Sequence, residues 1–289
     1  MKQFKIDAHS IMKNKIVSLA GQIAVYTSLI FATLIILLPL LIILSSAFKP
    51  ESEIFEYPMK WIPRNITFNN FAKLRQGNTD FLLYIFNSLK VTITIVAVQL
   101  LTATTGAYAF AKMKWKAREF VFLLYIGTMM IPGQVFVIPQ FIIVKNLGLY
   151  NSHAALVFVG AFTAFGTFLV KQFFMTIPDS LIEAARIDGA SEYRTFTTLI
   201  LPLSKPVLAT LIIFSFRYFW NDFFAPLIYL TSPELKTLAL GMSDFAGEYF
   251  TYYGPQMAAS LIAIVPVMVM FLFLQRFIMR GVVTTGIKG

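Results

Sequence analysis

One polar stretch interrupts an otherwise apolar chain: Glu183-Ala184-Ala185-Arg186-Ile187-Asp188-Gly189-Ala190, continuing to Leu199-Ile200-Leu201-Pro202. Of the 289 residues, 57% are hydrophobic and only 13% are charged, whereas a soluble domain has about 25% charged residues. Charged side chains are costly in lipid, so this stretch must face water between two membrane spans. It is therefore a candidate docking surface on a membrane protein with several spans.

The composition excludes several kinds of site. The chain has no cysteine, which rules out disulfides, thiolate metal sites and cysteine nucleophiles. His9 and His153 lie far apart, outside the apolar runs, so we expect no histidine metal site. The chain also lacks the Gly-x-x-x-x-Gly-Lys-Ser/Thr phosphate loop, so we predict that it does not hydrolyse ATP itself and has no catalytic, cofactor-binding or metal-binding residues.

Six apolar segments reach the roughly 20 residues that a spanning helix needs. We therefore predict an all-α integral membrane protein with six transmembrane helices, at about 21–48, 81–111, 120–144, 154–175, 206–230 and 257–279. Pro132 should bend the third span. Pro226 should loosen the fifth, because proline has no N–H to bond the carbonyl of Asp222.

The distribution of Lys and Arg predicts the orientation. The N-terminus, the 112–119 loop, the 176–205 loop and the C-terminal tail together carry twice as many basic residues as the loops on the other side. Because basic loops stay in the cytoplasm, we expect both termini and the 176–205 loop to be cytoplasmic. This topology accounts for the net charge of +10, so we expect no nucleic-acid partner.

The expected organisation has three parts. Residues 1–20 form a cytoplasmic N-terminal segment, residues 21–280 the transmembrane domain, and residues 281–289 a cytoplasmic tail. The first apolar run is far longer than the 7–15 residues of a secretory signal. We therefore interpret it as an uncleaved span.

The polar stretch has the signals of a helix–turn–helix. Pro178 suits the first turn of a helix, and Asp179 lies near the positive end of its dipole. Gly189 is placed to end that helix in a left-handed conformation, and Ser191 is placed to cap a second helix. A solvated loop is the alternative, but 30 residues is long for a simple connector, which favours docking.

The spacing in this stretch resembles the EAA loop of ATP-binding-cassette (ABC) importer permeases. The Asp188-Gly189-Ala190 form is similar to the carbohydrate-uptake, maltose-type family, and the short N-terminus resembles its smaller, G-type permease subunit. Further similarity includes Asn87-Ser88, Ala107-Tyr108-Ala109 and Trp220-Asn221-Asp222. The family has Ile where this chain has Leu199, a conservative difference.

The resemblance implies a function and a set of partners. It implies a permease subunit of an ATP-driven importer for an oligosaccharide or related polyol, in the bacterial cytoplasmic membrane. The partners would be a second permease, two ATPase subunits that bind ATP and Mg²⁺, an extracytoplasmic solute-binding protein and membrane lipid. The residues carried over as coupling the loop to the ATPases are Glu183, Ala184, Ala185, Asp188 and Gly189.

A second candidate site lies inside the fifth span. Arg217, Asn221 and Asp222 are polar residues at expected membrane depth, and Arg217 and Asn221 share a helix face. They could line the path of a hydroxylated solute, or they could contact the second permease or neighbouring helices. Both interpretations stay open at this point.

Two other functions are compatible with a membrane protein of this size. A membrane-embedded enzyme acting on lipid-linked sugars would need acidic or histidine catalytic groups on an interfacial loop. Only the two expected outer loops, 49–80 and 231–256, offer acids, and these form no recognisable pair. A stand-alone secondary transporter would be expected to show an inverted repeat, and we find none.

Overall fold

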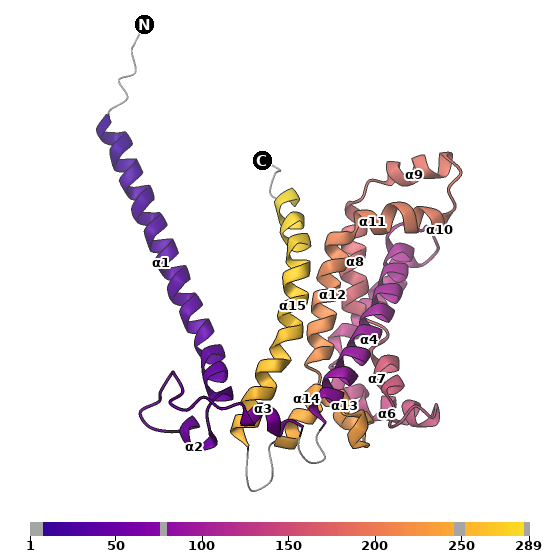
Figure 1. Ribbon diagram of the computed structural model, residues 1–289. Helices are drawn as coiled ribbons and strands as arrows, with labels where there is room; N and C mark the ends of the chain where they lie inside the picture. Colours follow the sequence, from indigo (N-terminus) through magenta and orange to yellow (C-terminus); the bar gives the residue numbers. More distant parts are fainter. Residues whose placement is uncertain (1–7, 76–79, 246–251, 286–289) are drawn as a thin grey trace. The chain divides into compact units, whose positions relative to one another are not determined.

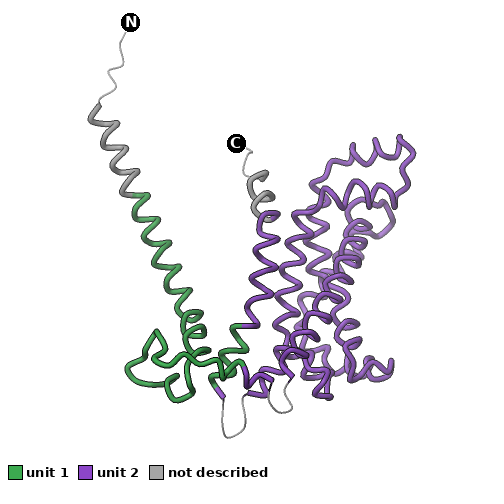
Figure 2. Tube along the Cα trace, viewed as in Figure 1, with its two compact units in different colours: residues 1–71, 253–261 green, residues 72–252, 262–289 purple. Residues whose placement is uncertain are grey.

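A computed structural model describes residues 8–75, 80–245 and 252–285, and these residues form helices and turns without a β-strand. The chain divides into two compact units, residues 1–71 with 253–261 (unit 1) and residues 72–252 with 262–289 (unit 2) (Figure 2). The helices are α1 (Ala8–Ala47), α2 (Glu51–Ile54), α3 (Asn69–Lys73), α4 (Phe81–Ala111), α5 (Arg118–Gly127), α6 (Val137–Asn146), α7 (His153–Gly160), α8 (Ala164–Thr176), α9 (Asp179–Ile187), α10 (Glu192–Arg194), α11 (Leu201–Leu203), α12 (Lys205–Trp220), α13 (Phe224–Tyr229), α14 (Leu238–Gly241) and α15 (Tyr253–Thr285), with short 3-10 turns and one π-helical segment between some of them.

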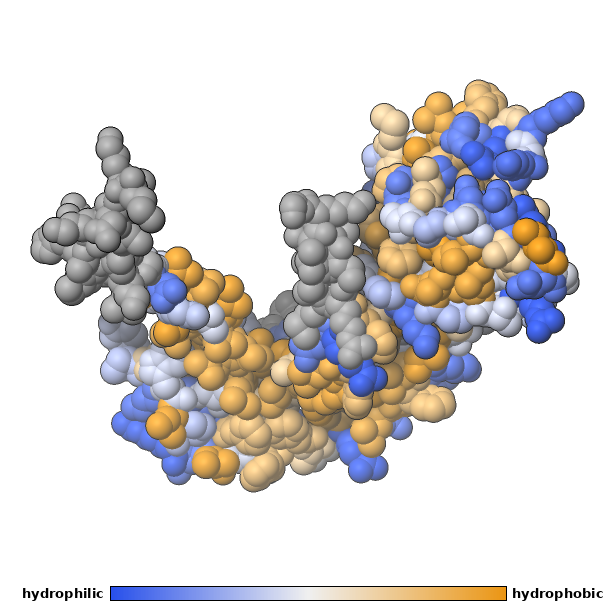
Figure 3. Space-filling model, turned by 90° about the horizontal axis from the view of Figure 1, so that it is seen from above, coloured by the Kyte–Doolittle hydropathy of each residue, from blue (hydrophilic) through white to orange (hydrophobic). Residues whose placement is uncertain are grey.

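Within the described residues, three helices are long and apolar enough to cross a membrane, or up to six if each bent pair forms one span. The three are Gly21–Ala47, Phe81–Ala111 and Tyr253–Phe277. Large hydrophobic side chains cover much of the visible surface, as expected for helices that face lipid or partner subunits (Figure 3).

Proline positions account for the breaks in the third and fifth expected spans, whereas the bend in the fourth was not predicted from the sequence. The third expected span is bent by 95° between Met130 and Gly133, around Pro132. The fourth is bent by 44° after Gly160, where Thr163 starts a new helix by accepting a hydrogen bond from Gly166 N at 3.0 Å. The fifth is not one helix, because α12 ends at Trp220 and α13 begins at Phe224.

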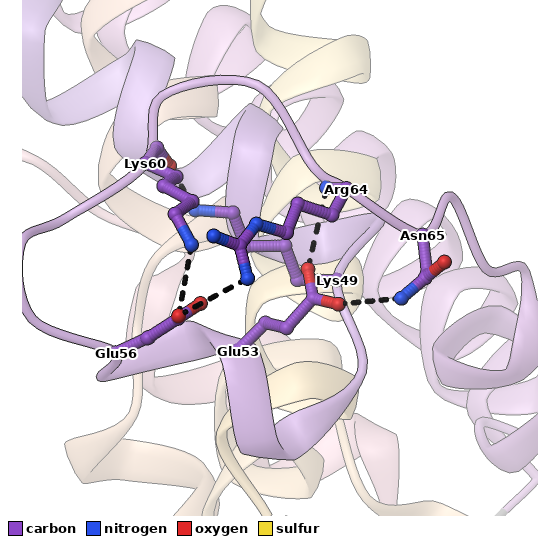
Figure 4. Close-up of polar contacts among 6 residues, drawn as sticks. All are labelled: Lys49, Glu53, Glu56, Lys60, Arg64 and Asn65. Carbon is purple, nitrogen blue, oxygen red and sulfur yellow. Dashed lines mark hydrogen bonds and ion pairs between the residues drawn. The ribbon is translucent and has the colours of Figure 1, made fainter.

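In unit 1, a polar network holds the segment that follows α1 (Figure 4). Glu53 accepts hydrogen bonds from Asn65 Nδ2 at 2.9 Å and from Arg64 N at 3.3 Å. Glu56 pairs with Lys60 at 2.8 Å, and this hydrogen bond lowers the pKa of Glu56. The carboxylate of Glu51 binds the N–H groups of Tyr253 and Gly254 at the start of α15, at 2.8 and 2.9 Å, where an anion is favoured.

Unit 2 is built around α4, which runs for 31 residues without a break (Figure 1). It packs most extensively against α8 and α12. Small residues such as Ala103 and Ala107, both fully buried, allow the close approach, and Val170, Phe174 and Leu211 fill the space around them.

The outward-facing end of α4 in the expected topology holds the segment 230–245. Asn87 Nδ2 donates to the carbonyls of Glu234 and Lys236 at 2.8 and 3.0 Å, and Ser88 Oγ accepts from Leu238 N at 2.7 Å. These side chains satisfy backbone groups that helix and sheet ladders leave unpaired. The remaining residues of the expected outer loop, 246–251, lie outside the described residues.

Gly241 in this segment lies against the ring of Tyr84. A Cβ at position 241 would lie 2.1 Å from Tyr84 Cδ2. We predict that Gly241→Ala destabilises the protein by about 1–3 kcal/mol through overpacking, measured by thermal or denaturant unfolding in detergent. Gly127→Ala is the matched control, since a Cβ there meets nothing within 4 Å. Equal stability of the two variants would contradict this packing.

Candidate functional site: a helix–turn–helix loop and a polar cavity

The polar stretch forms the expected helix–turn–helix in unit 2. Pro178 precedes α9, and Gly189 has a φ of +79°, so it ends α9 in the left-handed region that favours glycine. Ser191 caps the next helix by accepting from Arg194 N at 3.2 Å. Helical structure then continues from Glu192 to Leu203, bent by 77° from α12 (Figure 1). These local predictions are confirmed.

Part of this second helix is π-helical. Residues Thr195–Ile200 form the π-helical segment. Such bulges are rare and are frequently found at functional sites. The sequence analysis did not predict it.

Polar contacts attach the loop to the end of α4. Tyr108 Oη donates to Glu192 Oε2 at 2.6 Å, and Arg186 pairs with the other oxygen of Glu192 at 2.7 Å. Lys112 Nζ donates to Asp179 Oδ1 at 2.6 Å and to the Ile177 carbonyl at 2.7 Å. The loop is thereby held at two places along its length.

These contacts set the charge state of the loop. The hydrogen bond from Lys112 lowers the pKa of Asp179, and the hydrogen bond from Tyr108 lowers that of Glu192. The hydrogen bond to Glu192 raises the pKa of Arg186. All three side chains are therefore ionised at neutral pH.

One face of α9 is buried and the other is open. Ile182 is 3% exposed and packs in the same core cluster as Tyr108, Phe174 and Ile200. On the open side, Ile187 is 86% and Leu181 is 43% exposed. Of the residues expected to couple the loop, Glu183, Ala184, Asp188 and Gly189 are exposed and Ala185 is half-buried. The open face combines apolar, small and charged groups.

A cavity with a mainly apolar lining and several polar residues lies elsewhere in unit 2, among α4, α7, α8, α12 and α13. Its volume is about 480 Å³, and we call it the α4–α12 cavity. Ser88, Thr92 and Gln99 on α4 line one side. Their spacing places them on one helix face.

The cavity is partly stabilised by its own hydrogen bonds. Gln99, only 4% exposed, donates to the carbonyl of Gly160 at 2.7 Å and accepts from Ser215 Oγ at 2.7 Å. Thr92 and Thr237 are also among the lining residues, but their hydroxyl oxygens are buried and have no hydrogen-bond partner among the described residues.

The three polar residues expected at mid-span do not all lie at the α4–α12 cavity. Arg217 and Asp222 line the α4–α12 cavity, and they form no ion pair with each other. Asn221 ends α12 and donates to the Arg217 carbonyl at 2.7 Å. It is not among the residues lining the cavity.

Sequence reasoning missed the attachment residues and most of the cavity lining. Tyr108 lies within the Ala107-Tyr108-Ala109 motif and Lys112 within the basic 112–119 loop, and neither pattern indicates a contact with the 176–205 loop. The polar face of Ser88, Thr92 and Gln99 in an apolar helix was a usable signal. The sequence alone does not show that the same cavity is lined by Thr163, Ser215 and Thr237, because this depends on how the helices pack.

The apolar helices, the exposed helix–turn–helix and the cavity are compatible with a membrane permease. The chain belongs to the family of binding-protein-dependent transport system inner membrane components, whose family model matches residues 102–283. It is a permease subunit of an ABC transport system.

Individual relatives are similar over almost the whole chain. The arabinooligosaccharides transport system permease protein AraQ of Halalkalibacterium halodurans is 32% identical over 261 residues, covering 90% of this chain and 94% of that protein. The sn-glycerol-3-phosphate transport system permease protein UgpE of Salmonella typhi is 34% identical over 265 residues, covering 89% and 94%.

Two solved structures share the fold. A bacterial ABC transporter involved in the import of the acidic polysaccharide alginate matches with a TM-score of 0.76 and 24% identity, over 95% of this chain and 99% of that chain. The alginate transporter in complex with its alginate pentasaccharide-bound periplasmic protein matches with a TM-score of 0.58 and 16% identity, over 88% and 93%.

The attachment of the loop to α4 has a pH dependence. A lowered pKa of Glu192 means that its contacts stabilise the folded chain above the ordinary pKa of 4.5, and that this contribution is lost as pH falls through the lowered value. We predict that Glu192→Gln is less stable at pH 7, by less than about 1 kcal/mol because the pair is half exposed. The difference should vanish under acid conditions.

The measurement is thermal unfolding of both proteins across pH, with Glu234→Gln as the control. Glu234 is exposed, and no ion pair involves its carboxylate among the described residues. A stability difference for Glu192→Gln that stays constant with pH would rule out the ionised contact.

Proposed function

We propose that this chain is the transmembrane permease subunit of an ATP-driven importer for a sugar, oligosaccharide or related polyol. The observation that carries the proposal is the exposed helix–turn–helix, held to α4 in a chain of this family. AraQ and UgpE, by their names, serve arabinooligosaccharide and sn-glycerol-3-phosphate transport, which supports the substrate class. Family membership favours neither the enzyme nor the secondary transporter.

The proposed topology has six spans with both termini in the cytoplasm of a bacterial cell. It counts the bent pairs Arg118–Met130 with Gly133–Asn146 and His153–Gly160 with Ala164–Thr176 as one span each. The fifth span is α12 with α13, and Glu192–Leu203 belongs to the cytoplasmic loop. The excess of Lys and Arg sets the sidedness. In this topology residues 1–20 and 281–289 are the cytoplasmic ends, and residues 21–280 form the membrane domain.

The loop is the proposed contact with the ATPase subunits, which would bind and hydrolyse ATP with Mg²⁺. Ile187 and Leu181 supply apolar contact area, while Ala184 and Gly189 let another backbone approach closely. Glu183 and Asp188 give the contact a charge pattern. Movement of the docked loop would reach α4 through Tyr108 and Lys112.

The remaining partners act along the transport path. A second permease would complete the path with this chain, and alternating access would open it to one side at a time. An extracytoplasmic solute-binding protein would deliver the substrate to the outer loops. The structural match to a transporter in complex with a periplasmic protein is consistent with such a partner. Arg217 and Asp222 are the proposed path residues, with Asn221 at the helix end beside them.

The direct test is co-purification of the ATPase subunits with this chain. We expect Glu183→Lys to reduce the recovered ATPase at least about tenfold, because it reverses a charge on the docking face, and Gly189→Pro to abolish recovery. Glu183 is exposed, so Glu183→Lys should leave the fold intact.

Glu234→Lys is the matched control, because it makes the same charge reversal at an exposed position outside the loop. It should leave ATPase recovery unchanged. ATP-independent transport by this chain alone would contradict the proposed function, as would full recovery of the ATPase with Glu183→Lys.

A further inference from the structure

The two charged residues that line the α4–α12 cavity are not equivalent. Asp222 Oδ1 accepts hydrogen bonds from Phe224 N at 3.0 Å and from Ala225 N at 3.3 Å, at the start of α13. Its carboxylate is therefore bound by backbone donors within the chain. Arg217 makes no side-chain hydrogen bond or ion pair with any residue that the structure describes. The uncommitted charge at the cavity is positive.

The cavity is large enough for a small solute. Thr92 and Thr237 lie in its wall, but their hydroxyl oxygens are buried and are not presented to it. Its volume of about 480 Å³ lies within the 300–1,000 Å³ range of small-molecule sites.

We propose that the α4–α12 cavity binds a polyhydroxylated solute that carries an anionic group, either a carboxylate or a phosphate. Arg217 binds the anionic group, because a guanidinium matches both of these anions with paired hydrogen bonds. The inference rests on the proposed function, since it makes the cavity a solute-binding site on the transport path and narrows the substrate class.

The alternative role for Arg217 is a contact with the second permease. The side chain is exposed, so an acidic residue of the second permease could pair with it instead. In that case its removal would weaken the association of the two permeases and would not change solute preference. The experiment below separates the two roles.

The test measures direct binding to the purified transporter complex, without the solute-binding protein, by equilibrium dialysis. The probes are two matched pairs of labelled molecules: glucuronate with glucose, and glycerol 3-phosphate with glycerol. We expect the anionic member of at least one pair to bind about tenfold or more tightly than its neutral partner. The pair that shows the preference identifies the carboxylate or the phosphate as the anion.

Variants assign the preference to named residues. Arg217→Gln should remove it while leaving the neutral probe unchanged, and Arg217→Lys should retain only part of it, because an ammonium group keeps the charge but not the paired hydrogen bonds. Arg75→Gln is the matched control, because Arg75 is exposed and does not line the cavity.

Three results would overturn the inference. They are equal binding or no binding of the paired probes at millimolar concentration, a preference that survives Arg217→Gln, or loss of the second permease from the Arg217→Gln complex. Co-purification of the ATPases and ATP-dependent uptake are read on the same preparation. A complex that assembles and transports but shows no anion preference keeps the proposed function and overturns only this inference.

Discussion

The polar contacts at the two ends of α4 are the interactions on which the rest of unit 2 depends. A helix in lipid must satisfy its backbone internally, and α4 does so for 31 residues, while three neighbouring helix pairs are bent by 44° to 95°. At one end Tyr108 and Lys112 bind the 176–205 loop. At the other, Asn87 and Ser88 bind the segment 230–245. The unbroken helix therefore links two segments that bind its opposite ends.

The same helix supplies one wall of the α4–α12 cavity. Ser88 accepts a hydrogen bond from Leu238 N and also lines the cavity, so one residue contacts both the segment 230–245 and the cavity. A shift of α4 relative to α12 would alter the cavity and the attachment of both segments together. This gives the proposed importer a physical route from ATPase docking to the solute path, since a packed helix moves as a unit rather than deforming.

The sequence predicted local features well because short-range chemistry determines them. The Pro178 start, the left-handed Gly189 and the Ser191 cap depend on neighbouring residues, and the structure confirms all three. The bond between Tyr108 and Glu192 joins positions 84 residues apart, and no local pattern indicates it. Likewise, no sequence pattern indicates the buried, unpaired hydroxyls of Thr92 and Thr237, because their burial depends on the packing of α4 against the segment 230–245. The ATPase contact and the cytoplasmic side remain predictions.

The absence of cysteine makes cross-linking the most direct test of the docking loop. Ile187→Cys introduces one thiol into this chain, at a position 86% exposed on α9. With a thiol-specific photo-cross-linker in the assembled membrane complex, the account predicts a covalent product with the ATPase subunit. Tyr57→Cys, also highly exposed but in the expected outer loop, should give no such product. Failure of the residue 187 thiol to reach the ATPase, or its labelling from outside the cell by a membrane-impermeant maleimide, would contradict the account.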